Sequence, residues 1–226
     1  MLRIEKLSKS FGKKTLLQSI SLQLKSGEVH GIVGENGAGK TTFFKCIAQL
    51  ESHQGSVVFS DASQTPSIGF LETNPQFLSK MTGKEYLQLL CNARNINAVN
   101  FDDSNLFDLP LQQYASTYST GMKKKLALTG ILLQQNDIFI LDEPFNGVDI
   151  QSNILIKEII KKLQEKGKII LLSSHIFTTL QDTCDFLHYL KAGKIEKSVE
   201  KEKFPFIEEL MKDAALHNKL QKFNIK

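Results

Sequence analysis

The chain has 226 residues, of which 41% are hydrophobic, and it carries a formal net charge of +4. This length and composition suit a soluble α/β domain. No run reaches about 18 apolar residues, which excludes a membrane-spanning helix, and the N-terminal residues MLRIEKLSKSF lack the apolar core of a signal peptide. We therefore expect a cytoplasmic protein.

Charge argues against a nucleic-acid partner, and cysteine spacing argues against a metal site or disulfides. Basic residues are spread along the chain rather than clustered, so we expect no nucleic-acid partner. Cys46, Cys91 and Cys184 lack the spacing of metal ligands, and an odd number of cysteines argues against a disulfide framework. We expect buried or idle thiols.

The N-terminal region predicts strands. Residues Leu2–Leu7 and Ile20–Leu24 alternate between apolar and polar side chains, and Lys25-Ser26-Gly27 supplies a turn after them. This pattern is typical of a half-exposed antiparallel sheet.

A glycine-rich segment, GENGAGKTT at residues 34–42, matches the P-loop pattern and lies between an apolar strand at residues 29–33 and a predicted helix from Lys40 to Leu50. Its glycines let consecutive backbone amides surround a phosphate chain at the positive end of the helix. Lys40 can reach the β- and γ-phosphates, and the Thr41 hydroxyl can ligate magnesium. We expect a nucleoside triphosphate to bind Gly34, Glu35, Asn36, Gly37, Ala38, Gly39, Lys40, Thr41 and Thr42.

The middle of the chain predicts a change from strands to helices. Residues Ser56–Phe59 and Ile68–Leu71 indicate short strands, and Thr82-Gly83-Lys84-Glu85 is a capping box that opens a helix. We interpret residues 73–135 as a helical subdomain. It includes an amphipathic stretch from Met122 to Leu133.

From Asp137 onward, strands and helices alternate. Strands are predicted at IFIL, KIILLSS and FLHYL, with a helix over Gln151–Glu165 and another that ends near Thr183. Such alternation predicts a parallel sheet covered by helices.

The strand in IFILDEP ends in two carboxylates, Asp142 and Glu143, at the edge of the sheet where such folds bind ligands. Asp142 can hold magnesium directly or through water, and Glu143 can polarise an attacking water. The alternative is that the pair caps the next helix. The upstream P-loop favours catalysis.

A further motif, Tyr118-Ser119-Thr120-Gly121-Met122, resembles the signature of the ATP-binding cassette (ABC) ATPases. The resemblance extends to Phe11 as the adenine-stacking aromatic residue, to Asn146–Asp149 as the D-loop and to Ser173–His175 as the switch histidine. It covers residues 2–195, and GMKKKL is similar to cassettes of exporters that have separate membrane subunits.

This resemblance implies a fold, an activity and partners. The fold is α/β: a P-loop NTPase core with a parallel sheet and an N-terminal antiparallel sheet (about residues 2–72 and 136–197), an inserted helical subdomain (about 73–135) and a C-terminal helical tail (about 198–226). The activity is Mg²⁺-dependent hydrolysis of ATP. The partners are transmembrane permease subunits and a second ATPase subunit, in a homodimer or heterodimer, at the inner face of the membrane.

The resemblance also assigns residue roles. Phe11 stacks on adenine, unless it simply packs at a strand end. Ser119 and Gly121 form a second anion site that closes on the γ-phosphate held by the other subunit. Asp149 links the two sites and can also cap a helix, and His175 contacts the γ-phosphate. A structural role is expected for the other histidines, which are His30, His53, His188 and His217.

One position departs from the family pattern. In the family, a glutamine or glutamate usually contacts magnesium and the membrane subunit at one position. Thr73, or less favourably Glu72, aligns with that position in this chain, and Gln76 lies three residues too late. A threonine hydroxyl is shorter and would reach the metal through water. We therefore expect coupling or rate to differ from the family and the enzyme to remain active, because Lys40, Asp142, Glu143 and His175 are all present.

Two other interpretations stay open. The first is an ATPase of DNA repair or chromosome organisation, but such proteins usually carry a coiled-coil or zinc insertion, and this chain has neither heptads nor Cys pairs. The second is an ATP-dependent switch on a soluble partner, for example in translation, where related proteins usually hold two cassettes and this chain has one.

The C-terminal region predicts a further helix. Residues 204–223 have an amphipathic pattern, and the helix either packs on the domain or docks on a membrane or partner.

Overall fold

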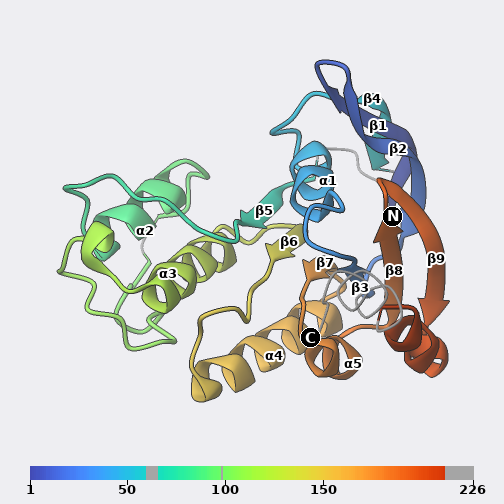
Figure 1. The fold of residues 1–226 in the computed structure, drawn as a ribbon. Helices are drawn as coiled ribbons and strands as arrows, with labels where there is room; N and C mark the ends of the chain where they lie inside the picture. The colour runs from blue at the N-terminus through green and yellow to red at the C-terminus, as the bar shows by residue number, and fades with distance from the viewer. Residues whose placement is uncertain (60–65, 98, 212–226) are drawn as a thin grey trace, which may run out of the picture.

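A computed structural model of the chain describes residues 1–59, 66–97 and 99–211. The described residues form a three-stranded sheet in the order β2-β1-β4 and a six-stranded sheet in the order β5-β6-β7-β3-β8-β9. Figure 1 shows helices packed around the larger sheet, with the smaller sheet at one end of the molecule.

The smaller sheet is antiparallel, as its sequence predicts. It contains β1 (Leu2–Phe11), β2 (Lys14–Leu24) and β4 (Gln54–Phe59). Strands β1 and β2 are both longer than the alternation of apolar and polar residues predicts. The pairing of β1 with β2 shifts in register at several points after Ile4, and these shifts break the alternation without ending the strands. Lys6 and Ser19 take positive φ angles of 50° and 49° near these shifts. Each irregularity changes which face the next side chain occupies, so the period of two is lost although the pairing continues.

The larger sheet is parallel except at one edge. Its parallel strands are β5 (Ile68–Leu71), β6 (Ile138–Asp142), β7 (Ile169–Ser173), β3 (Val29–Val33) and β8 (Phe186–Lys191), and β9 (Lys194–Glu200) pairs antiparallel to β8. Every residue of β3, β6 and β7 is buried. The sequence did not predict β9, because this edge strand is mostly exposed and rich in Lys and Glu, so it lacks an apolar signal.

Helices cover both faces of this sheet. On β6, Ile138 and Ile140 pack in one hydrophobic cluster with residues of α1 (Lys40–Ile47), whereas Phe139 and Leu141 pack in a second cluster with residues of α4 (Ile150–Glu165) and α5 (Phe177–Thr183). Helix α1 ends three residues before the predicted Leu50, because the chain turns at Gln49, where φ is 59°. The sheet therefore forms the middle layer of three.

Two further helices, α2 (Gly83–Asn92) and α3 (Thr120–Leu133), pack against each other. Figure 1 shows them on the side of the molecule opposite the antiparallel sheet. The predicted capping box is confirmed, because the Thr82 hydroxyl accepts a hydrogen bond from the Glu85 backbone and the Glu85 carboxylate accepts one from the Thr82 backbone. Both helices lie within residues 73–135, and the division into subdomains stays a prediction.

The C-terminal region differs from the predicted tail at its start. Residues 198–200 belong to β9, a 3₁₀ turn follows at Lys201–Lys203, and residues 204–211 are helical. Phe204 and Ile207 are buried in the cluster that contains α4 and α5, so this segment packs on the domain. The remainder of the predicted helix and His217 lie outside the described residues. Within the described ranges, no helix combines the length and apolar character that crossing a bilayer requires.

The three cysteines are free and buried, as predicted. Burial raises the pKa of the Cys184 thiol to about 12. A thiol in this environment stays protonated and is a poor nucleophile at neutral pH.

Two of the histidines expected to be structural form a buried polar chain. The ring of His30 lies 3.1 Å from the Glu28 carboxylate and 3.1 Å from the ring of His188, whose other nitrogen lies 2.8 Å from the Ser198 hydroxyl. Burial lowers the pKa of His30 from 6.5 to about 4 and that of His188 to about 3. Both rings are therefore neutral in the folded chain at pH 7.

This pair predicts an acid-sensitive fold. Below about pH 6.5 the unfolded chain protonates these two histidines while the folded chain does not, so the folded state binds fewer protons. The free energy of unfolding should therefore fall as the pH drops from 6.5 toward 4, by up to about 1.4 kcal/mol per pH unit for each histidine. Urea unfolding across this range measures the slope. A variant with His30→Gln and His188→Gln should give a shallower slope, and an unchanged slope would contradict this prediction.

Candidate nucleotide-binding and hydrolysis site

The P-loop connects the end of β3 to the start of α1. Gly39 precedes the helix with φ at 109°, a left-handed conformation that side chains disfavour, and α1 begins with neither a side-chain cap nor an acidic residue in its first turn. A Cβ atom at Gly34 would lie 2.2 Å from the Leu190 carbonyl oxygen, so the loop passes too close to β8 for any other residue. The helix thus offers its positive end to an anion.

A cavity of about 470 Å³ opens over this loop. It combines P-loop residues with hydroxyls and carboxylates from other strands. Its lining comprises Lys14, Leu16, Asn36, Gly37, Gly39, Lys40, Thr41, Thr42, Thr73, Asp142 and Glu143.

Lys40 lies over the loop, with its ammonium donating to the carbonyls of Gly34 (2.8 Å) and Glu35 (3.2 Å). Burial lowers the pKa of this lysine, while the charges of Glu143 and Asp142 partly oppose the shift. The lysine is thus held by loop carbonyls and by the field of the two acidic residues.

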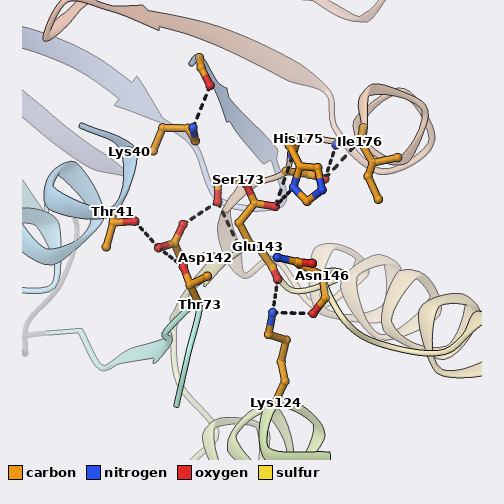
Figure 2. A network of polar contacts seen from close by, with 12 residues as sticks. Lys40, Thr41, Thr73, Lys124, Asp142, Glu143, Asn146, Ser173, His175 and Ile176 are labelled. Atoms are coloured by element: carbon orange, nitrogen blue, oxygen red, sulfur yellow. Dashed lines mark hydrogen bonds and ion pairs between the residues drawn. The ribbon is translucent and has the colours of Figure 1, made fainter. Parts of the chain in front are cut away.

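Asp142 is the centre of the polar network in Figure 2. The hydroxyls of Thr41 and Thr73 donate to its Oδ2 at 2.6 and 2.7 Å, and the hydroxyl of Ser173 donates to its Oδ1 at 2.6 Å. The residue is only 1% exposed. A buried carboxylate needs such donors to offset the loss of its hydration.

These oxygen atoms are suitable ligands for magnesium. Thr41, Thr73 and Asp142 supply two hydroxyls and one carboxylate at one point of the cavity. Among the described residues, no group of three or more His, Cys, Asp or Glu could hold a metal ion. Because Thr41, Thr73 and Asp142 all offer oxygen atoms, the donor set fits Mg²⁺, which prefers oxygen ligands, keeps several waters and commonly shares its coordination with substrate phosphates.

Thr73, which departs from the family pattern, lies in the site. Strand β5 ends at Leu71 beside the end of β6, which places the Thr73 hydroxyl on Asp142. Glu72 instead lies 3.5 Å from the ammonium of Lys45, and the Gln76 side chain donates to the carbonyl of Asn74.

Glu143 and His175 contact each other directly, which the sequence did not predict. The Nδ1 atom of the His175 ring lies 2.8 Å from Glu143 Oε2, and the His175 backbone amide donates to the same oxygen at 3.3 Å. The Glu143 side chain is 13% exposed, whereas that of His175 is 56% exposed. A carboxylate beside an imidazole at the edge of the cavity can take a proton from water and keep the imidazole oriented.

The residues of the second predicted anion site lie elsewhere. Ser119 caps α3 by accepting from the Met122 amide at 3.2 Å, and a Cβ atom at Gly121 would lie 2.5 Å from the Gly147 carbonyl oxygen. Neither residue lines the P-loop cavity. One chain thus carries the two predicted half-sites at separate places.

Asp149 caps α4, as the sequence allowed. Its carboxylate accepts from the Ser152 amide at 2.9 Å and the Ser152 hydroxyl at 2.8 Å, and it lies 3.1 Å from the ammonium of Lys125. These bonds, with the Ser152 amide as the largest cause, hold the pKa of Asp149 well below its usual range.

Phe11 does not line the cavity. Its ring is 51% exposed, and the ammonium of Lys9 lies 4.7 Å from the ring centroid. The cation occupies one face of the ring. Stacking on adenine stays a prediction.

One buried cation beside the site, Lys124, was not predicted from the sequence. Lys124 is 1% exposed, and its ammonium donates to the backbone carbonyls of Glu143 and Asn146. The amphipathic pattern expected over Met122–Leu133 gave no signal for Lys124, because every residue of α3 from Leu126 to Ile131 is buried and the helix has no distinct apolar stripe. Lys123 and Lys125, its neighbours in the KKK run, are partly exposed.

The arrangement defines a P-loop NTPase built as an ATP-binding cassette. The model of the family "ABC transporter" matches residues 17–146. The ABC transporter ATP-binding protein NatA of Bacillus subtilis is 35% identical, with 79% of each chain covered. The lantibiotic transport ATP-binding protein SrtF of Streptococcus pyogenes is 29% identical, with 97% of this chain and 99% of that protein covered.

Solved structures show the same fold. The ATP-binding subunit of an ABC transporter superposes with a TM-score of 0.79 at 23% identity, covering 98% of this chain and all of the other. A dimeric cassette bound to ADP and Pi after hydrolysis gives 0.79 at 20% identity, covering 89% of this chain and 99% of the other. The chain belongs to the ABC transporter family, and it is an ATP-binding and ATP-hydrolysing subunit.

Proposed function

We propose that this chain hydrolyses Mg-ATP to drive export through a separate membrane permease, and that it does so as one half of an ATPase dimer. The observation that carries this proposal is that Asp142 and Glu143 line the P-loop cavity while His175 contacts Glu143. The resident cation would be Mg²⁺, which would neutralise phosphate charge and orient the γ-phosphate.

Each residue has a defined part in this proposal. The P-loop amides and Lys40 hold the triphosphate, and Lys40 exchanges its loop carbonyls for phosphate oxygens. Thr41 and Asp142 would hold the cation, and the Thr73 hydroxyl would contribute through water. Glu143 accepts a proton from the attacking water while His175 steadies its carboxylate and contacts the γ-phosphate.

The separation of the half-sites favours a head-to-tail dimer. Ser119 and Gly121, at the start of α3, would close on the γ-phosphate bound to the P-loop of a second subunit. ATP would then bind both subunits in the closed dimer, and hydrolysis would release them. A ligand that binds the closed state more tightly shifts the equilibrium toward closure.

Two observations support this proposal, the first for a role in transport and the second for a protein partner. Similar proteins include a lantibiotic transport ATP-binding protein and a bacitracin transport ATP-binding protein, BcrA of Enterococcus faecalis, which is 29% identical over 88% of this chain. In addition, a cavity of about 600 Å³ beside α2 is flanked by Leu78 and Leu89, whose side chains are 67% and 50% exposed. Exposed apolar groups at a concave surface are typical of a protein contact. We place the subunit at the cytoplasmic face of the membrane, held there by the permease.

Removal of the Thr73 hydroxyl tests the magnesium site. Thr73→Val keeps the shape of the side chain but removes a donor from Asp142. We expect the Mg²⁺ concentration for half-maximal ATP hydrolysis to rise by about threefold or more, whereas Thr73→Ser should stay near the parent value. A titration of activity with Mg²⁺ measures this shift. Equal Mg²⁺ dependence of Thr73→Val and the parent chain would remove Thr73 from the proposed site.

Loss of the carboxylate tests the proposed base. Glu143→Gln should reduce kcat by about 100-fold or more, since general base catalysis contributes that much. ATP should still bind, and a stable dimer should accumulate with ATP. Phosphate release and size-exclusion chromatography with light scattering measure the two effects. Turnover equal to that of the parent chain would refute Glu143 as the group that activates water.

Purification from membranes tests the permease. We expect a polytopic membrane protein to copurify in stoichiometric amount from detergent-solubilised membranes of the source cells, and Leu78→Glu with Leu89→Glu to release it. Lys161→Glu, an exposed change on α4, is the control. Recovery of the parent chain only in the soluble fraction would move the proposal to a switch on a soluble partner.

A further inference from the structure

We infer that Lys124 is a positioning residue for hydrolysis, which holds the backbone that carries Glu143 and links it to the start of α3. This inference rests on the proposed role of Glu143 as the group that activates water.

The contacts of Lys124 are specific to the turn after β6. Its ammonium donates to the Glu143 carbonyl at 2.6 Å and to the Asn146 carbonyl at 2.8 Å, as Figure 2 shows. The Asn146 amide also donates to the Glu143 carbonyl at 3.2 Å, which closes the turn. Lys124 comes from a different segment and is 1% exposed, so water does not replace it easily.

The backbone at Glu143 needs such support. Its φ angle is 53°, in the left-handed region, which residues with a side chain disfavour. Its amide donates to the Ser173 hydroxyl at 3.0 Å, its carbonyl accepts from Lys124 and its carboxylate contacts His175. Three segments of the chain thus fix the amide, the carbonyl and the side chain of one residue.

Stability alone does not call for a lysine at this position. Burial lowers the pKa of Lys124, while the charges of Glu143 and Asp142 oppose the shift. A buried cation costs desolvation free energy, which an apolar side chain of similar length would avoid. The charged donor instead supplies hydrogen bonds about twice as strong as neutral ones to two carbonyls beside the proposed base.

Lys124 also belongs to a wider contact between α3 and residues 143–149. Gly121 approaches the Gly147 carbonyl so closely that a Cβ atom would lie 2.5 Å from it, and Lys125 lies 3.1 Å from Asp149. The first turns of α3, which begin at Ser119, are therefore joined to the segment that carries Glu143. A displacement of α3 on closure of the dimer would reach the proposed base through Lys124.

The test replaces the ammonium without changing the length of the side chain greatly. Lys124→Met should lower kcat for ATP hydrolysis by about tenfold or more, since small misplacement of a catalytic group has effects of this size. The KM for ATP and the dissociation constant for ATP should change by less than about twofold, because the P-loop is untouched. Lys161→Met on α4, where the lysine is exposed, is the matched control and should retain the parent kcat.

Two further variants separate positioning from folding. Lys124→Gln keeps an N–H donor without the charge and should recover part of kcat. In single-turnover measurements, adding Lys124→Met to Glu143→Gln should cause little further loss, because both changes act on one group. An additive loss, or a fall in kcat accompanied by an equal fall in ATP binding, would overturn the inference.

The same series distinguishes this inference from the proposed function. If Glu143→Gln is inactive while Lys124→Met and Lys124→Gln both keep the parent kcat, the inference fails and the proposed function stands. If Glu143→Gln keeps the parent turnover, the proposed function of Glu143 itself fails, and the inference fails with it.

Discussion

The candidate site depends on the burial of one carboxylate. Asp142 is 1% exposed at the end of β6, and a charge at that depth requires hydrogen-bond donors. Its three hydroxyl donors come from α1, from the segment after β5 and from the end of β7. Satisfying Asp142 therefore fixes the P-loop helix relative to two neighbouring strands. A magnesium ion bound there would meet a site whose oxygen ligands are already together.

The parallel sheet explains why these groups meet. Strands β5, β6 and β7 are adjacent and parallel, so their carboxyl ends lie at one edge of the sheet. Asp142 and Ser173 end β6 and β7 at this edge, and Thr73 lies two residues after the end of β5. The P-loop leaves the same edge from β3, which pairs with β7. The start of α3 is joined instead to residues 143–149, through Lys124 and the close approach of Gly121 to Gly147. This second connection joins the backbone that carries Glu143 to the residues of the predicted second anion site.

Local patterns predicted much of this arrangement, and their failures have physical causes. The strands β3, β6 and β7 are buried on both faces, so their continuous apolar runs were clear. Strand β9 was missed because it is an exposed edge strand with charged side chains, and the first three residues of the predicted helical tail belong to it. Strand β1 was predicted too short because its register shifts break the alternation. Helix α1 was predicted too long because the propensity of residues 48–50 did not reveal the turn at Gln49.

The sequence by itself determined the α/β class, the nucleotide chemistry and the candidate residues, because the P-loop and the other motifs are short segments whose chemistry depends on local spacing. Only the tertiary structure decided that Thr73 contacts Asp142, that His175 contacts Glu143 and that Lys124 holds the Glu143 carbonyl. These contacts join residues that are 69, 32 and 19 positions apart. Their distances depend on how strands and helices pack, and no local pattern of apolar and polar residues specifies that packing.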